Sequence, residues 1–136
     1  MIEGGAIDWA NHANDAQSSV RQMKEFADAI DIVIKWVEAN SNWNDTMIVI
    51  TADHETGGLA NDQGGFLLSD NGKGKLPNYK YNTGGHANLL VPVFAKGGNS
   101  EIFENFATSA DPIYGKYINN IDIPVIIASF LGVSFR

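Results

Sequence analysis

Each of the three histidines in this chain of 136 residues stands beside a residue type that metal sites use. His12 lies four positions after Asp8, a spacing that in a helix puts both side chains on one face with Cβ atoms about 5 to 6 Å apart. His54 directly follows Asp53, and His86 directly follows a Gly-Gly pair. Zinc bonds of about 2.0 to 2.2 Å can bridge such a carboxylate and imidazole pair. Spacing alone leaves open the alternative that each histidine is an ordinary hydrogen-bonded or surface residue.

Residues 46–51, Thr-Met-Ile-Val-Ile-Thr, form a short apolar run rich in β-branched side chains, shortly before Asp53 and His54. Such a run predicts a strand that is covered on both faces in a parallel sheet. The carboxyl end of such a strand is where open α/β sheets place their ligand sites. Neighbouring residues in a strand point to opposite faces of the sheet. Asp53 and His54 can therefore both bind a metal only if the chain has already left the strand before them. The Gly57-Gly58 pair nearby favours such a departure.

Two helices are predicted to flank the strands. Apolar residues at spacings of three and four predict a helix that begins at a cap, Asn14 or Asp15, and runs to about Asn40. A second helix is predicted over residues 122–131, with an aspartate cap and a proline in its first turn, and it ends at Gly132.

A second strand is predicted at residues 89–95, although Pro92 removes one ladder donor and favours a strand end, an edge or a bulge. The glycine-rich segment 55–85 predicts mostly loop, with an exposed turn at residues 70–75. The alternation of helix and strand indicates an α/β fold. No repeat or long linker divides the chain, so we expect a single domain.

The composition restricts the partners and the metal ligands. The formal net charge of −7 argues against a nucleic-acid partner, because phosphate backbones are bound by clustered lysine and arginine. The chain has no cysteine, so any metal must be held by oxygen and imidazole. No apolar run approaches the roughly 18 residues of a membrane-spanning helix, and the first residues lack a signal-peptide pattern. We therefore expect no membrane association.

Three segments resemble, in order, the motifs of the carboxyl-terminal portion of alkaline phosphatases: residues 1–12 (MIEGGAIDWANH), 51–54 (TADH) and 83–86 (TGGH). Residues 120–124 and the helix after them are similar to the closing segment of that family, whereas residues 55–82 match least. The resemblance implies that residues 1–136 are the carboxyl-terminal part of one alkaline-phosphatase-like domain. It also implies a doubly wound, mostly parallel sheet flanked by helices.

The resemblance further implies two zinc ions and one magnesium ion. Asp8, His12 and His86 would bind the first zinc, Asp53 and His54 would supply half of the second site, and Glu3 would bind magnesium. The six positive charges of three such ions exceed the three negative charges of the carboxylates, so an acidic chain could still bind an anionic phosphate monoester. In this family such a centre transfers a phosphoryl group to a serine and then to water.

The nucleophilic serine of the family has no counterpart in this sequence, so no catalytic residue is assigned and we expect the isolated chain to be inactive. The peptide 108–110 (TSA) lacks the aspartate that precedes the family's serine, and it is predicted to be a loop or a helix cap. We expect an amino-terminal portion to be missing. The chain should then expose strand edges and apolar helix faces, and it should self-associate as a homo-oligomer or need that complement.

Two other interpretations are open. The first is another enzyme of the same superfamily, of the phosphoglycerate mutase or phosphodiesterase type, although Glu3 five residues before Asp8 favours the phosphatase. The second is a non-catalytic metal-binding or association module, which predicts a stable monomeric fold without metal. The family resemblance implies a periplasmic or secreted location.

Overall fold

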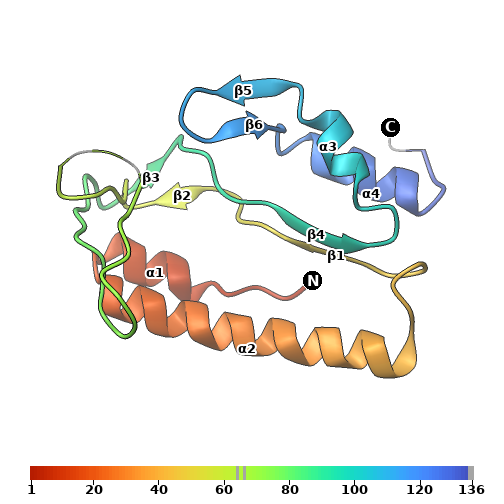
Figure 1. Ribbon diagram of the computed structural model, residues 1–136, viewed down its shortest axis with the longest axis horizontal. Helices are drawn as coiled ribbons and strands as arrows, with labels where there is room; N and C mark the ends of the chain where they lie inside the picture. Colours follow the sequence, from red (N-terminus) through yellow and green to blue (C-terminus); the bar gives the residue numbers. More distant parts are fainter. Residues whose placement is uncertain (64, 66, 135–136) are drawn as a thin grey trace. The chain divides into compact units, whose positions relative to one another are not determined.

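A computed structural model describes residues 1–63, 65 and 67–134. The chain divides into two compact units, the first made of Met1–Val33 and His54–Leu89 and the second of Ile34–Asp53 and Leu90–Arg136. Figure 1 shows the order of the helices and strands. The predicted assignment of residues 1–136 to one domain stays a prediction.

The first unit begins with two helices, α1 (Ala6–His12) and the first part of α2 (Ala16–Asn40). The backbone N–H of Ser18 donates a hydrogen bond to Asp15 Oδ1 at 3.0 Å, which satisfies one of the amide groups left unpaired at a helix start. The predicted helix with its cap at Asp15 and its end at Asn40 is therefore confirmed. Residues 8–12 are helical, as their spacing required.

The first unit also contains two very short strands, β2 (Glu55–Thr56) at the start of the glycine-rich segment and β3 (His86–Ala87) directly after it, which pair antiparallel. Thr56 lies opposite His86 in this pair. The predicted turn at residues 70–75 is confirmed, because the N–H of Lys75 donates to the carbonyl of Gly72 at 3.1 Å. The pairing of β2 with β3 brings together residues that are about thirty positions apart in the sequence.

The second unit contains a pair of longer strands, β1 (Met47–Ile50) and β4 (Phe94–Gly97), which lie side by side (Figure 1). They pair antiparallel, so the prediction that residues 46–51 form a strand is confirmed but the prediction of a parallel neighbour is wrong. Parallel strands need a crossover connection, usually a helix, and residues 51–93 contain no helix in their described part. The residues of β1 are partly exposed and are not covered on both faces.

The second predicted strand begins later than expected. Residues 89–93 lie outside β4, which starts directly after the proline-containing stretch. Pro92 has no N–H to donate, and its carbonyl oxygen accepts a hydrogen bond from Thr51 Oγ1 at 3.1 Å. The mixture of helices and strands agrees with the α/β class, and all strand pairs in the described part of the chain are antiparallel.

The rest of the second unit consists of α3 (Ile102–Phe106), the hairpin of β5 (Ser109–Asp111) and β6 (Gly115–Tyr117), and α4 (Asp122–Phe130). The 108–110 peptide, predicted as loop or cap, lies largely in β5. The end of α4 is as predicted, because Gly132 has a positive φ of 68° and the N–H of Val133 donates to the carbonyl of Ala128.

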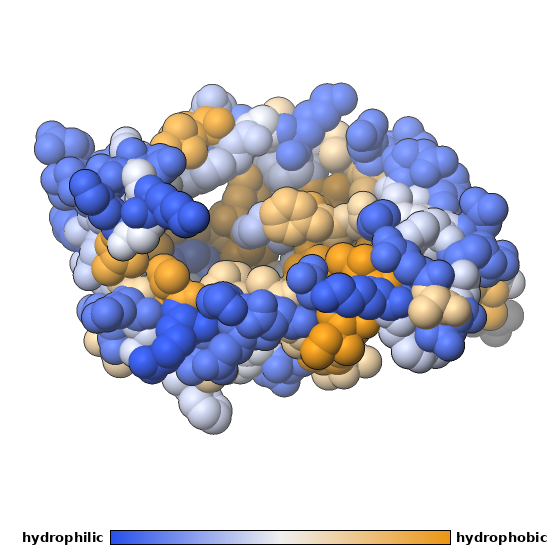
Figure 2. Space-filling model, turned by 60° about the horizontal axis from the view of Figure 1, so that its bottom comes forward, coloured by the Kyte–Doolittle hydropathy of each residue, from blue (hydrophilic) through white to orange (hydrophobic). Residues whose placement is uncertain are grey.

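Large apolar side chains reach the surface at many positions, and Figure 2 shows such groups on one face of the molecule. The fully buried side chains are few, with Val37 and Ile126 the largest of them among the described residues. No helix in the described part of the chain combines the length and the apolarity needed to cross a bilayer.

Candidate metal centre

Helix α1 presents Asp8 and His12 on one face, with His12 Nε2 3.4 Å from Asp8 Oδ2. The other ring nitrogen of His12, Nδ1, lies 2.6 Å from the carbonyl oxygen of Gly84. A carbonyl oxygen can only accept a hydrogen bond, so Nδ1 must carry the proton. The neutral ring then has its lone pair on Nε2, facing Asp8, which is the arrangement that metal-binding histidines adopt.

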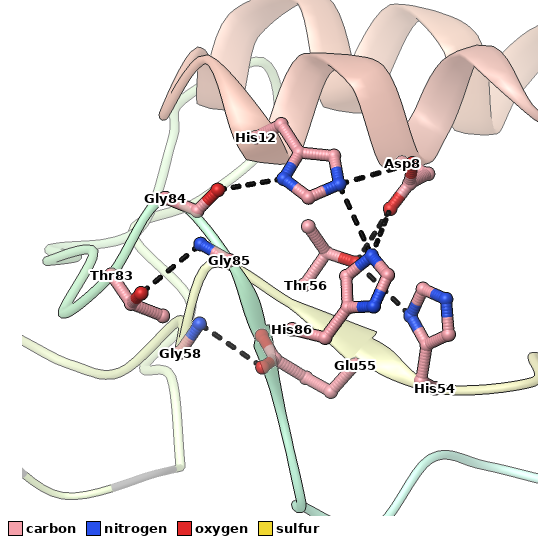
Figure 3. A network of polar contacts seen from close by, with 10 residues as sticks. All are labelled: Asp8, His12, His54, Glu55, Thr56, Gly58, Thr83, Gly84, Gly85 and His86. Atoms are coloured by element: carbon pink, nitrogen blue, oxygen red, sulfur yellow. Dashed lines mark hydrogen bonds and ion pairs between the residues drawn. The ribbon is translucent and has the colours of Figure 1, made fainter.

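His86 comes from β3 and points toward the same place (Figure 3). Its Nε2 lies 3.1 Å from His12 Nε2 and 3.7 Å from Asp8 Oδ1. Thus three potential ligand side chains converge from segments that are more than seventy residues apart.

The spacing of these atoms fits a tetrahedral zinc ion. Two ligand atoms at bond lengths of about 2.0 to 2.1 Å and a tetrahedral angle are separated by about 3.3 Å. His12 Nε2 and His86 Nε2 are 3.1 Å apart, which is close to that value. His12 Nε2 lies 3.4 Å from Asp8 Oδ2 and His86 Nε2 lies 3.7 Å from Asp8 Oδ1, so each imidazole approaches a different oxygen of the carboxylate at a similar separation. The donor set, one carboxylate and two imidazoles, is also one that zinc binds, and it leaves a fourth position for water or substrate.

His54 adds a fourth side chain to this cluster. Its ring stacks on that of His86, with centroids 3.5 Å apart and planes 25° apart. One possible ligand atom from each of Asp8, His54 and His86 lies within 4.8 Å of the others. The structure therefore groups His54 with two of the predicted ligands of the first zinc, and these three side chains are close enough to hold one metal ion together.

Thr56 contacts the cluster, and no pattern in the sequence predicted this contact. Its side chain is buried, with 7% of its surface exposed, and its hydroxyl donates a hydrogen bond to Asp8 Oδ1 at 2.6 Å. This bond is the largest cause of a pKa of Asp8 below the ordinary value; desolvation opposes it, and the three neighbouring histidines add to it. The only signal in the sequence was its place two residues after His54.

A turn centred on Gly57 joins the segments that carry the histidines. Its N–H donates to the carbonyl of Gly85 at 2.9 Å, and its own carbonyl accepts from the N–H groups of Asn82 and Thr83 at 3.0 and 3.1 Å. Gly57 has a φ of 99°, and a Cβ there would lie 2.6 Å from the ring of Tyr81. Glycine is therefore required for the backbone conformation and for the close approach.

The other predicted ligands are Glu3 and Asp53. Glu3 is exposed, in the irregular segment before α1. Asp53 is exposed and is assigned to the second unit, directly before His54 in the sequence. Asp53 and His54 lie in a bend outside any regular strand, as their binding a metal together required. Trp9, next to Asp8, is 73% exposed. The roles of Glu3 and Asp53 stay predictions.

Comparison with known proteins adds an independent line of evidence. A family model described as alkaline phosphatase matches residues 1–73, just over half of the chain. The chain belongs to the alkaline phosphatase family. The match includes Asp8, His12, Asp53, His54 and Thr56, and so most of the cluster lies inside it.

Individual alkaline phosphatases match over shorter stretches. The repressible alkaline phosphatase of Saccharomyces cerevisiae is 48% identical over 59 residues, which is 43% of this chain and 10% of the yeast protein. Alkaline phosphatase 3 of Bacillus subtilis is 40% identical over 60 residues, 44% of this chain and 12% of that protein. The matched stretch thus spans about a tenth of the length of these alkaline phosphatases.

The fold is also similar to a solved alkaline phosphatase, that of the Antarctic bacterium TAB5. The likeness has a TM-score of 0.55 at 34% identity and covers 73% of this chain and 28% of the TAB5 chain. A variant of the TAB5 enzyme was solved with magnesium bound in a site called M3. Structures of this family can therefore hold magnesium.

Proposed function

We propose that this chain supplies part of the paired-metal centre of an enzyme that hydrolyses phosphate monoesters. The observation that supports this most strongly is the convergence of Asp8, His12 and His86 at separations that suit tetrahedral zinc. Membership of the alkaline phosphatase family supports the phosphatase over the phosphoglycerate mutase and phosphodiesterase alternatives.

In this proposal Asp8, His12 and His86 hold the first zinc, His54 and Asp53 hold part of the second, and Glu3 contributes to a magnesium site. His54 is placed well for its role, because its ring stacks on a ligand of the first zinc. Asp53 adjoins it in the chain, where a bend follows the strand β1. Glu3 lies five residues before Asp8, within the segment that leads into α1.

When bound, zinc ions in such a centre stabilise negative charge on phosphate oxygens and make a hydroxyl or water more nucleophilic. The residues of this chain orient the centre. The carbonyl of Gly84 fixes the tautomer of His12, so that its Nε2 lone pair faces the centre. Asp8 contributes a negative charge. The hydrogen bond from Thr56 lowers the pKa of the Asp8 carboxyl group, so the group stays ionised to lower pH. The nucleophile comes from residues outside this sequence, so the chain alone binds metal without turnover.

Zinc binding and phosphatase activity test this proposal separately. Equilibrium dialysis of the chain against zinc, with a chelator-treated sample as control, should show at least one bound ion at pH 7 to 8. An assay with p-nitrophenyl phosphate at alkaline pH should show no hydrolysis above that of a sample without protein. Absence of bound zinc would overturn the metal site. Hydrolysis by the zinc-loaded chain would overturn the proposal that the nucleophile lies elsewhere.

We also propose that copies of the chain associate, and that the protein works in the periplasm or outside the cell. Self-association is supported by large apolar side chains that are more than half exposed, among them Ile32 (68%), Trp36 (60%) and Phe94 (61%). It is also supported by β1 and β4, which pair only with each other among the described residues. Sedimentation velocity at several concentrations should show a rise in the mean sedimentation coefficient; a constant monomer value would contradict association.

A further inference from the structure

Thr56 stands between two side chains that the proposed function assigns to different metal ions. Its Oγ1 lies 2.6 Å from Asp8 Oδ1 and 3.3 Å from His54 Nδ1 (Figure 3). The side chain is nine-tenths buried, and it lies in β2 directly opposite His86. A buried hydroxyl with two polar neighbours has a restricted set of hydrogen-bonding roles.

The inventory of donors and acceptors fixes the direction of both bonds. A hydroxyl has one proton, and an ionised carboxylate can only accept, so the Thr56 proton goes to Asp8. The oxygen of Thr56 then has only lone pairs to offer to His54. Nδ1 of His54 must therefore be the protonated nitrogen, which leaves Nε2 as the atom able to bind a metal.

We propose that Thr56 is a positioning residue that links the two metal-ligand sets, because one hydroxyl orients the Asp8 carboxylate and selects the metal-binding tautomer of His54. This inference rests on the proposed function. The chain of bonds runs from His54 Nδ1–H to Thr56 Oγ1–H to Asp8 Oδ1, so the ligand of one ion and the ligand of the other are held in a fixed relation before metal arrives. His12 is held in a similar way by the carbonyl of Gly84.

The matched variants are Thr56→Val, which keeps the shape and β-branching but lacks the hydroxyl, and Thr56→Ser, which keeps the hydroxyl. Thr108→Val is the control, because its side chain is exposed and far along the chain from the cluster. Zinc affinity is measured by competition with a chromophoric chelator, and the protonated nitrogen of His54 is identified from its ¹⁵N–¹H couplings without metal. Far-UV circular dichroism establishes that each variant is folded.

We expect Thr56→Val to weaken zinc binding by about 10- to 100-fold, the usual effect of losing an outer-shell partner, with Thr56→Ser and Thr108→Val within about 3-fold of the wild type. In the wild type and Thr56→Ser, His54 should carry its proton on Nδ1, and Thr56→Val should lose this preference. Wild-type affinity in Thr56→Val, or a proton on Nε2 of wild-type His54, would overturn the inference.

The two measurements separate this inference from the proposed function. If the wild type binds no zinc but His54 keeps the Nδ1 proton only when residue 56 has a hydroxyl, the proposed metal site fails and the positioning role of Thr56 stands. If the wild type binds zinc and Thr56→Val binds it equally well, the proposed function stands and the positioning role fails.

Discussion

The two units of the chain are held together in different ways. In the first unit, side-chain hydrogen bonds join residues 48 to 72 positions apart, as between Thr56 and Asp8, His12 and Gly84, and Tyr81 and Asn11. Among its described residues, the buried apolar side chains are small, namely Ala10, Ala16 and Ala60. Directional bonds fix the relative positions of polar groups, whereas apolar burial does not.

The second unit relies more on apolar burial. Val37, Phe103, Ile126 and Ala128 are its buried apolar residues among those described. Its side-chain hydrogen bonds are mostly local, within five positions, and the bond from Thr51 to the Pro92 carbonyl is the long-range exception. The comparison teaches that the unit with the ligands is organised to hold polar groups in place, and the other to bury apolar surface.

The largest expected effect is a loss of stability without a loss of metal affinity. Ile126 is fully buried in α4, so Ile126→Ala should lower the free energy of unfolding by about 2 to 5 kcal/mol, measured by urea denaturation. The folded protein should still bind zinc as the wild type does. Val125→Ala is the control, since Val125 is 39% exposed and its truncation should cost about 1 kcal/mol or less. A large loss of zinc affinity in folded Ile126→Ala would contradict the division of roles.

A loss of stability of similar size, now coupled to the site, is expected from Gly57→Ala. Positive φ alone costs an alanine about 1 to 2 kcal/mol, and overlap with the Tyr81 ring should add about 1 to 3 kcal/mol. Gly72→Ala is a close control, because Gly72 has a φ of 95° but no atom near its Cβ position. Urea denaturation and zinc titration of both variants measure the difference. Equal effects in the two variants would show that the Tyr81 contact is unimportant.

Asp8→Asn tests the carboxylate in the cluster itself. The amide keeps the shape but removes the negative charge, so zinc binding should weaken by about 100-fold or more, beyond the range for outer-shell partners. Asp28→Asn is the matched control, because Asp28 pairs with Lys24 on the exposed surface of α2 at 2.7 Å. The same chelator competition measures both affinities. A similar weakening in both variants would mean that net charge, and not ligation, controls zinc binding.

The smallest expected effect concerns pH and the start of α2. Hydrogen bonds from Ser18 hold the pKa of Asp15 below its ordinary value. Because the folded pKa is the lower one, the stabilisation is fully present above the unfolded pKa, about 3.9, and is lost as pH falls through the folded value. Asp15→Asn keeps a cap acceptor that does not titrate. The wild type should therefore lose more stability than this variant between about pH 4.5 and 2.5, measured by urea denaturation. Parallel losses would exclude a contribution from Asp15.

Local patterns in the sequence predicted local structure well. The i, i+4 pair of Asp8 and His12, the cap at Asp15 and the glycine end of α4 are each confirmed, because a helix is determined by residues within a few positions of one another. The prediction that residues 46–51 lie in a parallel sheet was wrong, because β1 pairs antiparallel with β4. Direction depends on the path of the residues between the strands, and no pattern within either strand records that path.

The residues of the candidate site also fall into those that the sequence could predict and those that it could not. The histidines and Asp8 could be found from residue type and spacing, together with the family resemblance. The place of Thr56 could not, because a threonine in a short strand is an ordinary β-branched residue until its hydroxyl meets a carboxylate 48 positions away. The backbone carbonyl of Gly84 is still less visible, because every residue has such a group.

The sequence by itself determined which ligands are available to a metal, oxygen and imidazole without thiolate, and which helix would carry the first two of them. Only the tertiary structure decided that His86 and His54 meet them, which nitrogen of each ring is turned to the centre, and which hydroxyl holds the carboxylate. The physical reason is the separation along the sequence of the residues that interact. Helix formation depends on neighbours along the chain, whereas a metal centre depends on distances of a few ångströms between groups that the chain separates widely.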